Sequence, residues 1–153
     1  MVLNNYKAIT MKNLVMALAL FIAQGAMAQD ASVKKSIDTF FEGMHSKDTV
    51  KIKSVCHTGM MLQSVSERGG KTALNTENMT DFYTSIASIP AGMKIEERLL
   101  DYKIQIDGAM AHAWTPYEFY INGQLSHKGV NSFQLFNDNG IWKIIYIVDT
   151  RRK

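Results

Sequence analysis

The last third of the chain constrains the fold most. Between Ala109 and Arg151, three long stretches of strand-forming residues are separated only by Asn122-Gly123 and Asn139-Gly140. Asn-Gly pairs are strong hairpin signals because the tightest hairpin turns need positive φ angles at both central residues. We therefore predict an antiparallel meander, long enough to form a curved sheet around a pocket.

Upstream of the meander, helical and strand patterns alternate. The predicted elements, in chain order, are a helix from Asp30 or Ser32, a short helix over 49–56 capped by Asp48, a hairpin over 59–74, a helix from Asn75 or Thr76 to Pro90, and a strand over 94–106. Apolar residues recur at helical spacing in the first and third helices. The prediction is an α+β domain in which three N-terminal helices pack on one face of a strongly curved antiparallel sheet.

Pro116 interrupts one strand of the meander. Proline cannot donate a ladder hydrogen bond, so it belongs at a sheet edge or at a bulge. A single inserted residue at Pro116 would place Tyr117 and Phe119 on the same face as His112 and Trp114. We therefore predict a bulge at Pro116 that bends the sheet around a cavity.

The final strand, over 141–148, is apolar on both faces. Its two predicted sets of side chains are Trp142, Ile144, Tyr146 and Val148 against Ile145 and Ile147. An antiparallel strand with one solvated face alternates more cleanly than this. Helices can cover one face, and a second copy of the chain is the simplest cover for the other, so a homodimer through the sheet is expected.

The N-terminus has the pattern of a secretory signal peptide. Lys7 and Lys12 precede an unbroken apolar run over 14–22, and Ala26-Met27-Ala28 gives a cleavage pattern of small residues. The run is too short for a permanent membrane anchor, which needs about 20 residues. We expect residues 1–28 to be removed, with Met1 or Met11 as the start, leaving 29–153 as one periplasmic or secreted domain.

Charge and motifs exclude several classes of function. Loss of the two lysines before residue 28 lowers the net charge from +3 to +1, and no basic stripe favours nucleic acid. Cys56 is the only cysteine, so no disulfide forms within the chain. The four histidines lack metal-ligand spacing, and no glycine-rich phosphate loop is present, so neither a metal nor a cofactor is expected.

Through the order of its elements over 32–151, the chain resembles the nuclear transport factor 2-like superfamily, which includes ketosteroid isomerase, polyketide-cyclase-like proteins and a lumazine-binding branch. The residues that carry the resemblance are Trp114, Tyr117, Phe119-Tyr120, Gly123, Ser126-His127, Gly129-Val130, Phe133, Leu135 and Trp142-Lys143-Ile144. The resemblance implies a cone in which helices lie against a curved sheet. It also implies a pocket at the wide end and a convex face that often dimerises. No catalytic motif of the superfamily's enzymes matches a stretch of this chain.

Two residues are candidates for acid/base chemistry. His127 falls in step with Gly129 and Asn131 on its strand, and its ordinary pKa of about 6.5 suits general acid/base catalysis. Asp149 ends the last strand near the expected cavity, where burial would raise its pKa. The alternatives are a structural histidine that bonds the neighbouring strand, and an ion pair of Asp149 with Arg151 or Arg98.

Three functions remain open. The first is a binding domain for a small apolar or aromatic molecule; its expected ligand-binding residues are Trp114, Tyr117, His127, Asn131, His112 and Tyr83. The second is an enzyme of the isomerase, cyclase or dehydratase kind, with His127 or Asp149 as the base. The third is a structural dimerisation module whose cone is filled by its own side chains, including Met60, Met61 and Met79.

Overall fold

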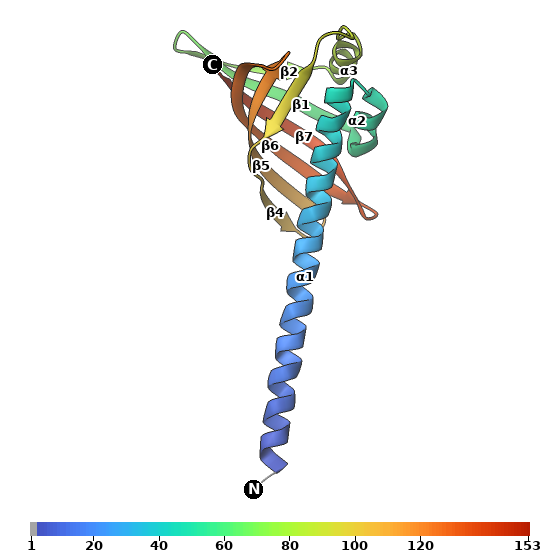
Figure 1. The fold of residues 1–153 in the computed structure, drawn as a ribbon, viewed down its shortest axis with the longest axis vertical. Coiled ribbons are helices and arrows are strands. Elements are labelled where there is room, and N and C mark those ends of the chain that lie inside the picture. The colour runs from blue at the N-terminus through green and yellow to red at the C-terminus, as the bar shows by residue number, and fades with distance from the viewer. Residues whose placement is uncertain (1–2) are drawn as a thin grey trace.

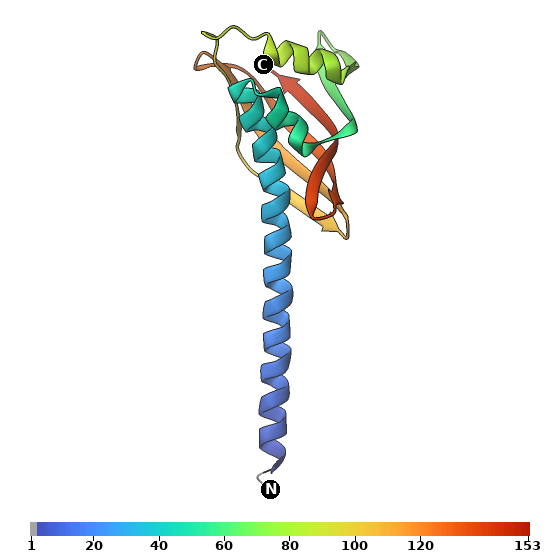
Figure 2. The ribbon, with the colours of Figure 1, turned by 90° about the vertical axis from the view of Figure 1, so that its right-hand side faces the viewer.

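One seven-stranded sheet with helices on its concave side makes up the domain (Figures 1 and 2). The structure is a computed structural model that describes residues 3–153. The strands are β1 (Cys56–Arg68), β2 (Lys71–Glu77), β3 (Ile95–Leu99), β4 (Lys103–Asp107), β5 (Met110–Ile121), β6 (Gln124–Asp138) and β7 (Ile141–Arg152). Their order in the sheet is β2-β1-β7-β6-β5-β3, and β4 also pairs with β5. The α+β class and the curved sheet are confirmed.

The first helix, α1 (Leu3–Ser46), is longer than expected. It runs through Asp30 and Ser32 without a break, so neither residue is a helix start. Its first part projects beyond the domain (Figures 1 and 2), and its core side chains begin at Val33. The predicted signal peptide falls in the projecting part, except for residues 1 and 2, which lie outside the described residues. No helix in the described range 3–153 has an apolar stretch that could cross a membrane.

The two shorter helices are α2 (Thr49–Val55) and α3 (Met79–Ala87). Asp48 caps α2 as predicted, because its carboxylate accepts hydrogen bonds from the backbone N–H groups of Val50 and Lys51 at 3.0 and 2.9 Å. The cap of α3 is Asn78, and the predicted start at Asn75 or Thr76 is wrong. Both of those residues belong to β2, which pairs with β1 as far as Glu77.

The sheet is mixed and not wholly antiparallel. β1 and β7 run parallel, while the other paired strands run antiparallel. The hairpin turns lie where they were predicted, with positive φ at Asn122-Gly123 and Asn139-Gly140. The strand expected over 94–106 is two strands, β3 and β4, which pair with successive parts of β5.

The predicted bulge at Pro116 is wrong. The Pro116 carbonyl accepts from the Leu100 N–H, so its ring nitrogen faces the interruption between β3 and β4, where no donor is required. The register of β5 shifts instead between Phe119 and Tyr120. Alternation along β5 therefore stays regular up to Phe119. It places Tyr117 on the concave face and His112 and Trp114 on the convex face.

A second irregularity lies in β7, where Gln134 pairs with Tyr146 but Leu135 pairs with Ile144. The extra residue, Ile145, shifts the alternation of β7. Trp142 and Ile144 consequently share the buried face with Ile147 and Asp149, and not with Tyr146 and Val148 as predicted.

The hydrophobic core lies between the three helices and the concave face. Phe40 and Phe41 of α1 pack edge-on against Phe133 of β6, with ring centroids 6.5 and 6.0 Å apart. Phe40 also stacks on Phe82 of α3 at 6.0 Å. Burying each of these rings stabilises the fold by about 2–3 kcal/mol. The narrow part of the cone is thus filled by side chains, and open space lies at its wide end.

Candidate functional site

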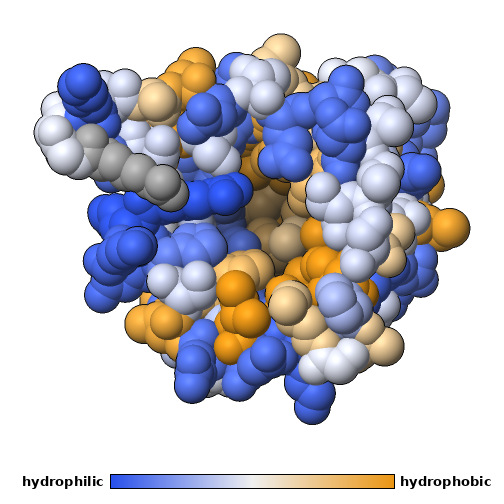
Figure 3. All heavy atoms as spheres, turned by 90° about the horizontal axis from the view of Figure 1, so that it is seen from above, coloured by the Kyte–Doolittle hydropathy of each residue, from blue (hydrophilic) through white to orange (hydrophobic). Residues whose placement is uncertain are grey.

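A cleft of about 1360 Å³ lies between elements that Figure 1 shows at the end of the domain farthest from the N-terminus; the cleft itself is defined by its lining side chains. We call it the mouth cleft. Its walls come from the β1–β2 hairpin, the start of α3, the start of β6 and the end of β7; its lining residues are Ser64, Ser66, Glu67, Gly69, Ala73, Asn75, Thr76, Glu77, Asn78, Asp81, Ser126, His127, Arg151, Arg152 and Lys153. Figure 3 shows a hollow at this end; hydrophilic residues border it on the left and above, hydrophobic residues border it below, and its floor is hydrophobic.

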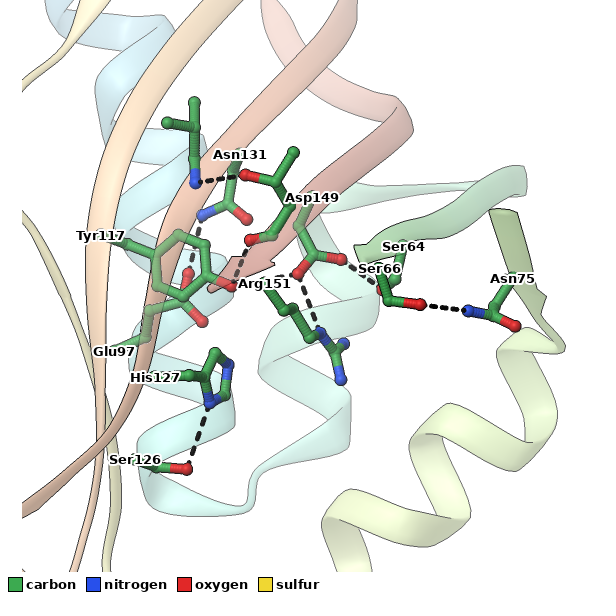
Figure 4. Close-up of polar contacts among 12 residues, drawn as sticks. Ser64, Ser66, Asn75, Glu97, Tyr117, Ser126, His127, Asn131, Asp149 and Arg151 are labelled. Atoms are coloured by element: carbon green, nitrogen blue, oxygen red, sulfur yellow. Dashed lines mark hydrogen bonds and ion pairs between the residues drawn. The ribbon is translucent and has the colours of Figure 1, made fainter. Parts of the chain in front are cut away.

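Beside this cleft, polar side chains from five neighbouring strands meet on the concave face (Figure 4). Successive side chains of a strand point to opposite faces of the sheet. On the concave face, the inward-facing side chains are polar at the wide end and apolar further down, in the core. We call this set the mouth cluster; its members are Ser64, Glu97, Tyr117, Asn131, Asp149 and Arg151. Ser64 and Arg151 belong to both the cluster and the cleft lining.

Asp149 is the centre of the mouth cluster. Its carboxylate is buried and accepts from the Ser64 hydroxyl, from the Tyr117 hydroxyl at 3.0 Å and from Arg151 Nε at 2.9 Å. The Tyr117 hydroxyl also lies 3.0 Å from the Thr150 carbonyl. Burial, followed by the charge of Asp149, raises the pKa of Tyr117, so the phenol stays protonated and acts as a donor. Both oxygens of Asp149 are therefore engaged by protein groups.

Glu97 of β3 is the second carboxyl of the cluster. Asn131 Nδ2 donates to its Oε1 at 2.7 Å, and its backbone N–H donates to His45 Nε2 at 2.8 Å. Burial, with a contribution from the charge of Asp149, raises the pKa of Glu97 to about 7, although Asn131 and Arg151 oppose the shift. At neutral pH this side chain therefore exists in both protonation states.

His45, at the end of α1, is the neutral partner of Glu97. Burial lowers the pKa of His45 against the opposing charge of Glu96. Its Nε2 accepts a hydrogen bond, which requires the neutral imidazole. The contact ties α1 to β3 directly behind the Glu97 side chain.

His127 of β6 lies in the cleft wall near the cluster without a hydrogen bond to Asp149. Its ring stacks on Phe119 at 4.9 Å and meets Tyr117 edge-on at 5.9 Å. Its Nδ1 lies 3.2 Å from the Ser126 hydroxyl. Burial and then the positive charge of Arg151 lower the pKa of His127, so the neutral ring prevails at neutral pH.

Among the predicted ligand-binding residues, Tyr117, Asn131 and His127 come together at the mouth, and three others do not. His112 and Trp114 lie on the convex face of β5, where His112 Nε2 is 3.1 Å from the Ser132 hydroxyl and the Trp114 side chain is 43% exposed. The expected aromatic lip with Tyr117 is therefore wrong, since the predicted bulge that joined the two faces does not exist. Tyr83 lies on α3, where burial and Cys56 raise the pKa of its phenol.

The sequence predictions missed Glu97. The signal was present, since Ile95 and Leu99 flank it at positions i−2 and i+2 of a strand and so point to the same buried face. The charged neighbours Glu96 and Arg98 concealed it, because three successive charged residues read as a solvated segment.

Two further features delimit the chemistry of this region. Thr115 is fully buried beside Asn131, and its hydroxyl has no hydrogen-bond partner among the described residues, which sets it apart from the other buried side chains there. The described residues contain no group of histidine, cysteine and acidic side chains placed to hold a metal ion. The mouth cluster thus provides hydrogen-bonding groups, the partly exposed guanidinium of Arg151 and the titratable carboxyl group of Glu97.

Comparison with known proteins identifies the fold. No protein-family model and no curated protein matches the sequence. Among solved structures, an NTF2-like protein of unknown function from Methylobacillus flagellatus matches with a TM-score of 0.60 and 21% identity, covering 82% of this chain and 94% of its own. A second NTF2-like protein of unknown function, from Shewanella baltica, matches with a TM-score of 0.62 and 12% identity over 83% and 96% of the two chains.

A third structure gives the same answer under another fold name. It is a protein of unknown function with a cystatin-like fold from Nostoc punctiforme, with a TM-score of 0.63 and 10% identity over 80% of this chain and 90% of its own. The chain therefore has an NTF2-like, α+β fold, in which helices pack on a mixed curved sheet.

Proposed function

We propose that this protein is an exported small-molecule-binding protein whose ligand occupies the mouth cleft and contacts the mouth cluster. The observation that carries the proposal is the placement of two carboxyl groups, Glu97 and Asp149, in one half-buried polar cluster that borders an open cleft. Burying ionisable groups lowers stability unless they are fully paired, so a fold gains nothing from Glu97 in this position. Perturbed acids beside a cleft are typical of binding and catalytic sites.

The aromatic side chains at the cleft indicate the shape of the ligand. His127, which lines the cleft, stacks on Phe119 at 4.9 Å and meets the ring of Tyr117 edge-on at 5.9 Å. Such a group favours a planar or aromatic molecule, while Asn131 and Tyr117 fix its polar atoms. The resemblance to the lumazine-binding branch makes a lumazine the first compound to test.

Catalysis is the second candidate function, and Glu97 is the observation that favours it. An acid with a pKa of about 7 can both accept and donate a proton at neutral pH. Asp149 is less suited because three donors already occupy its oxygens. The proposal for an isomerase, cyclase or dehydratase therefore moves the base from His127 or Asp149 to Glu97. Glu97→Gln would then abolish turnover while the ligand still binds.

Native mass spectrometry of the protein purified from its own host tests the binding proposal. We expect a retained small molecule on the wild-type chain and its loss from Tyr117→Phe, which lacks the cluster hydroxyl. Tyr146→Phe is the matched control, because the Tyr146 hydroxyl bonds Gln63 on the convex face at 2.5 Å. Equal retention by both variants, or no retained molecule in any sample, would contradict the proposal.

A further inference from the structure

We propose that the mouth cleft selects an organic anion, and that Arg151 binds its carboxylate. This inference rests on the proposed binding function and specifies the chemical class of the ligand. It starts from the way in which Arg151 is held. Its Nε donates to Asp149 at 2.9 Å, while its terminal nitrogens have no hydrogen-bond partner among the described residues. In Figure 4 the guanidinium end points away from Asp149.

This arrangement orients one edge of the guanidinium and leaves the other open. The side chain of Arg151 is 52% exposed and lines the mouth cleft, whereas that of Asp149 is 9% exposed. A guanidinium fixed through Nε presents its two outer N–H groups in the fork that matches a carboxylate. Because it is already oriented, less side-chain entropy is lost when a ligand binds.

The carboxylate of Asp149, which holds Arg151, does not face the ligand. Asp149 accepts from Ser64, Tyr117 and Arg151, so its oxygens are turned into the protein. Glu97 carries only part of a charge near neutrality, which weakens its repulsion of an incoming anion. The group that the mouth cluster presents to the cleft is therefore the cation.

Other charges line the cleft on both sides. Arg152 and Lys153 follow Arg151 in sequence. Glu67 and Glu77 come from the neighbouring β1–β2 hairpin and Asp81 from α3, and the charge of Glu77 acts on Arg151. All five are exposed, so solvent screens them more than it screens a group at the cluster. Specificity for an anion is thus expected to come from the fixed fork of Arg151 and not from the net charge of the cleft.

Arg98 differs from Arg151 because its guanidinium group is paired through two nitrogens with a neighbouring side chain. It lies on the opposite face of the sheet, where Nε and Nη2 both bond Glu96 at 2.9 and 2.8 Å and its guanidinium lies 4.0 Å from the ring centre of Tyr120. Its fork is already used by a neighbouring side chain. Arg98→Lys is therefore a matched control for Arg151→Lys.

The test uses matched aromatic probes with the full chain, followed by amide NMR. The probes are benzoate, benzamide and benzylamine, and indole-3-acetate with its amide and amine counterparts. We expect the acids to shift the amide signals of Ser126, His127 and Arg151, and the amides and amines to bind about tenfold more weakly. Arg151→Lys should reduce acid binding by about the same factor, and Arg98→Lys should leave it unchanged.

The probe titrations distinguish a wrong ligand class from the absence of any binding site. Equal binding of acids and amides in the cleft, preferential binding of amines, or acid binding that survives in a folded Arg151→Lys variant would overturn the anion inference and leave the binding function standing. If no probe of any class shifts a cleft signal, both are contradicted. Should Arg151→Lys not fold, the comparison of the three probe classes on the wild-type chain decides alone.

Discussion

The stability of the protein is expected to depend on the protonation of Glu97. Its pKa is raised from 4.5 to about 7 in the folded protein, so the folded state holds the proton more tightly than the unfolded state. Ionising Glu97 therefore costs more in the folded state, so the protein is most stable below the unfolded pKa and loses stability as the pH rises through about 7. After discounting for partial exposure, we expect a loss of about 2 kcal/mol between about pH 5 and about pH 8.

Urea unfolding of the wild type and of Glu97→Gln at both pH values checks this. The difference between the two proteins isolates Glu97 from His45, whose lowered pKa has the opposite effect, with stability lost as the pH falls through the folded pKa. Parallel pH profiles for the two proteins would show that Glu97 does not titrate in this range.

The polar side chain of Thr115 is expected to lower stability. Its buried hydroxyl lacks a partner among the described residues, and leaving such a group unpaired costs about 1–3 kcal/mol. We expect Thr115→Val, which has nearly the same shape, to raise the free energy of unfolding by about 1 kcal/mol. Thr150→Val is the matched control and should lower it, because the Thr150 hydroxyl accepts from the Val130 N–H at 3.2 Å. Similar losses in both variants would contradict the assignment.

How far residues could be predicted depended on what surrounded them in sequence. His127, Gly129, Asn131 and Phe133 occupy every second position of one strand, so the sequence alone predicts that they share a face. The face of Glu97 was not predicted, because it is defined by Ile95 and Leu99 while the direct neighbours of Glu97 are charged. The sequence does suggest an ion pair of Asp149 with Arg151, two residues away, but the bonds of Asp149 to Ser64 and Tyr117 join strands far apart in sequence.

The strands β6 and β7 approach each other closely beside the cluster, at Gly129. A Cβ atom at Gly129 would lie 1.7 Å from the Thr150 carbonyl oxygen and 2.9 Å from the Tyr117 ring. Gly129→Ala should therefore move the end of β7 and lower the free energy of unfolding by about 2 kcal/mol or more.

Chemical denaturation checks this against Gly92→Ala. A Cβ at Gly92 would meet no atom within 4 Å, so that variant should be near neutral. Tolerance of Gly129→Ala at the level of Gly92→Ala would mean that the strand ends are more adaptable than their packing indicates.

Elements with local signals were predictable, and those set by long-range pairing were not. The Asn-Gly turns and the Asp48 cap depend on a few adjacent residues, and both lie where they were predicted. The parallel pairing of β1 with β7 and the extra residue Ile145 arise from how distant strands meet, and no turn residue marks them. The incorrect bulge at Pro116 followed from treating one proline locally, without the break between β3 and β4 that accommodates it.

At the scale of the whole molecule, we propose that the convex face pairs with a second copy of the chain. Trp114 is 43% exposed there, and Tyr146 and Val148 lie partly buried on the same face. Trp114→Glu should shift the mass measured by light scattering from dimer to monomer. Val50→Glu, at an exposed site on α2 and away from the convex face, should leave the mass unchanged. A wild-type monomer would contradict this assembly.

We propose that the mouth cluster contacts a small molecule bound in the cleft. The most direct test is the carbon NMR signal of the Glu97 carboxyl group, assigned by its absence in Glu97→Gln, before and after addition of a small-molecule extract from the protein's own host. We predict that the extract shifts the Glu97 signal and leaves that of Glu118, on the convex face, in place. A Glu97 signal that does not move would contradict the claim.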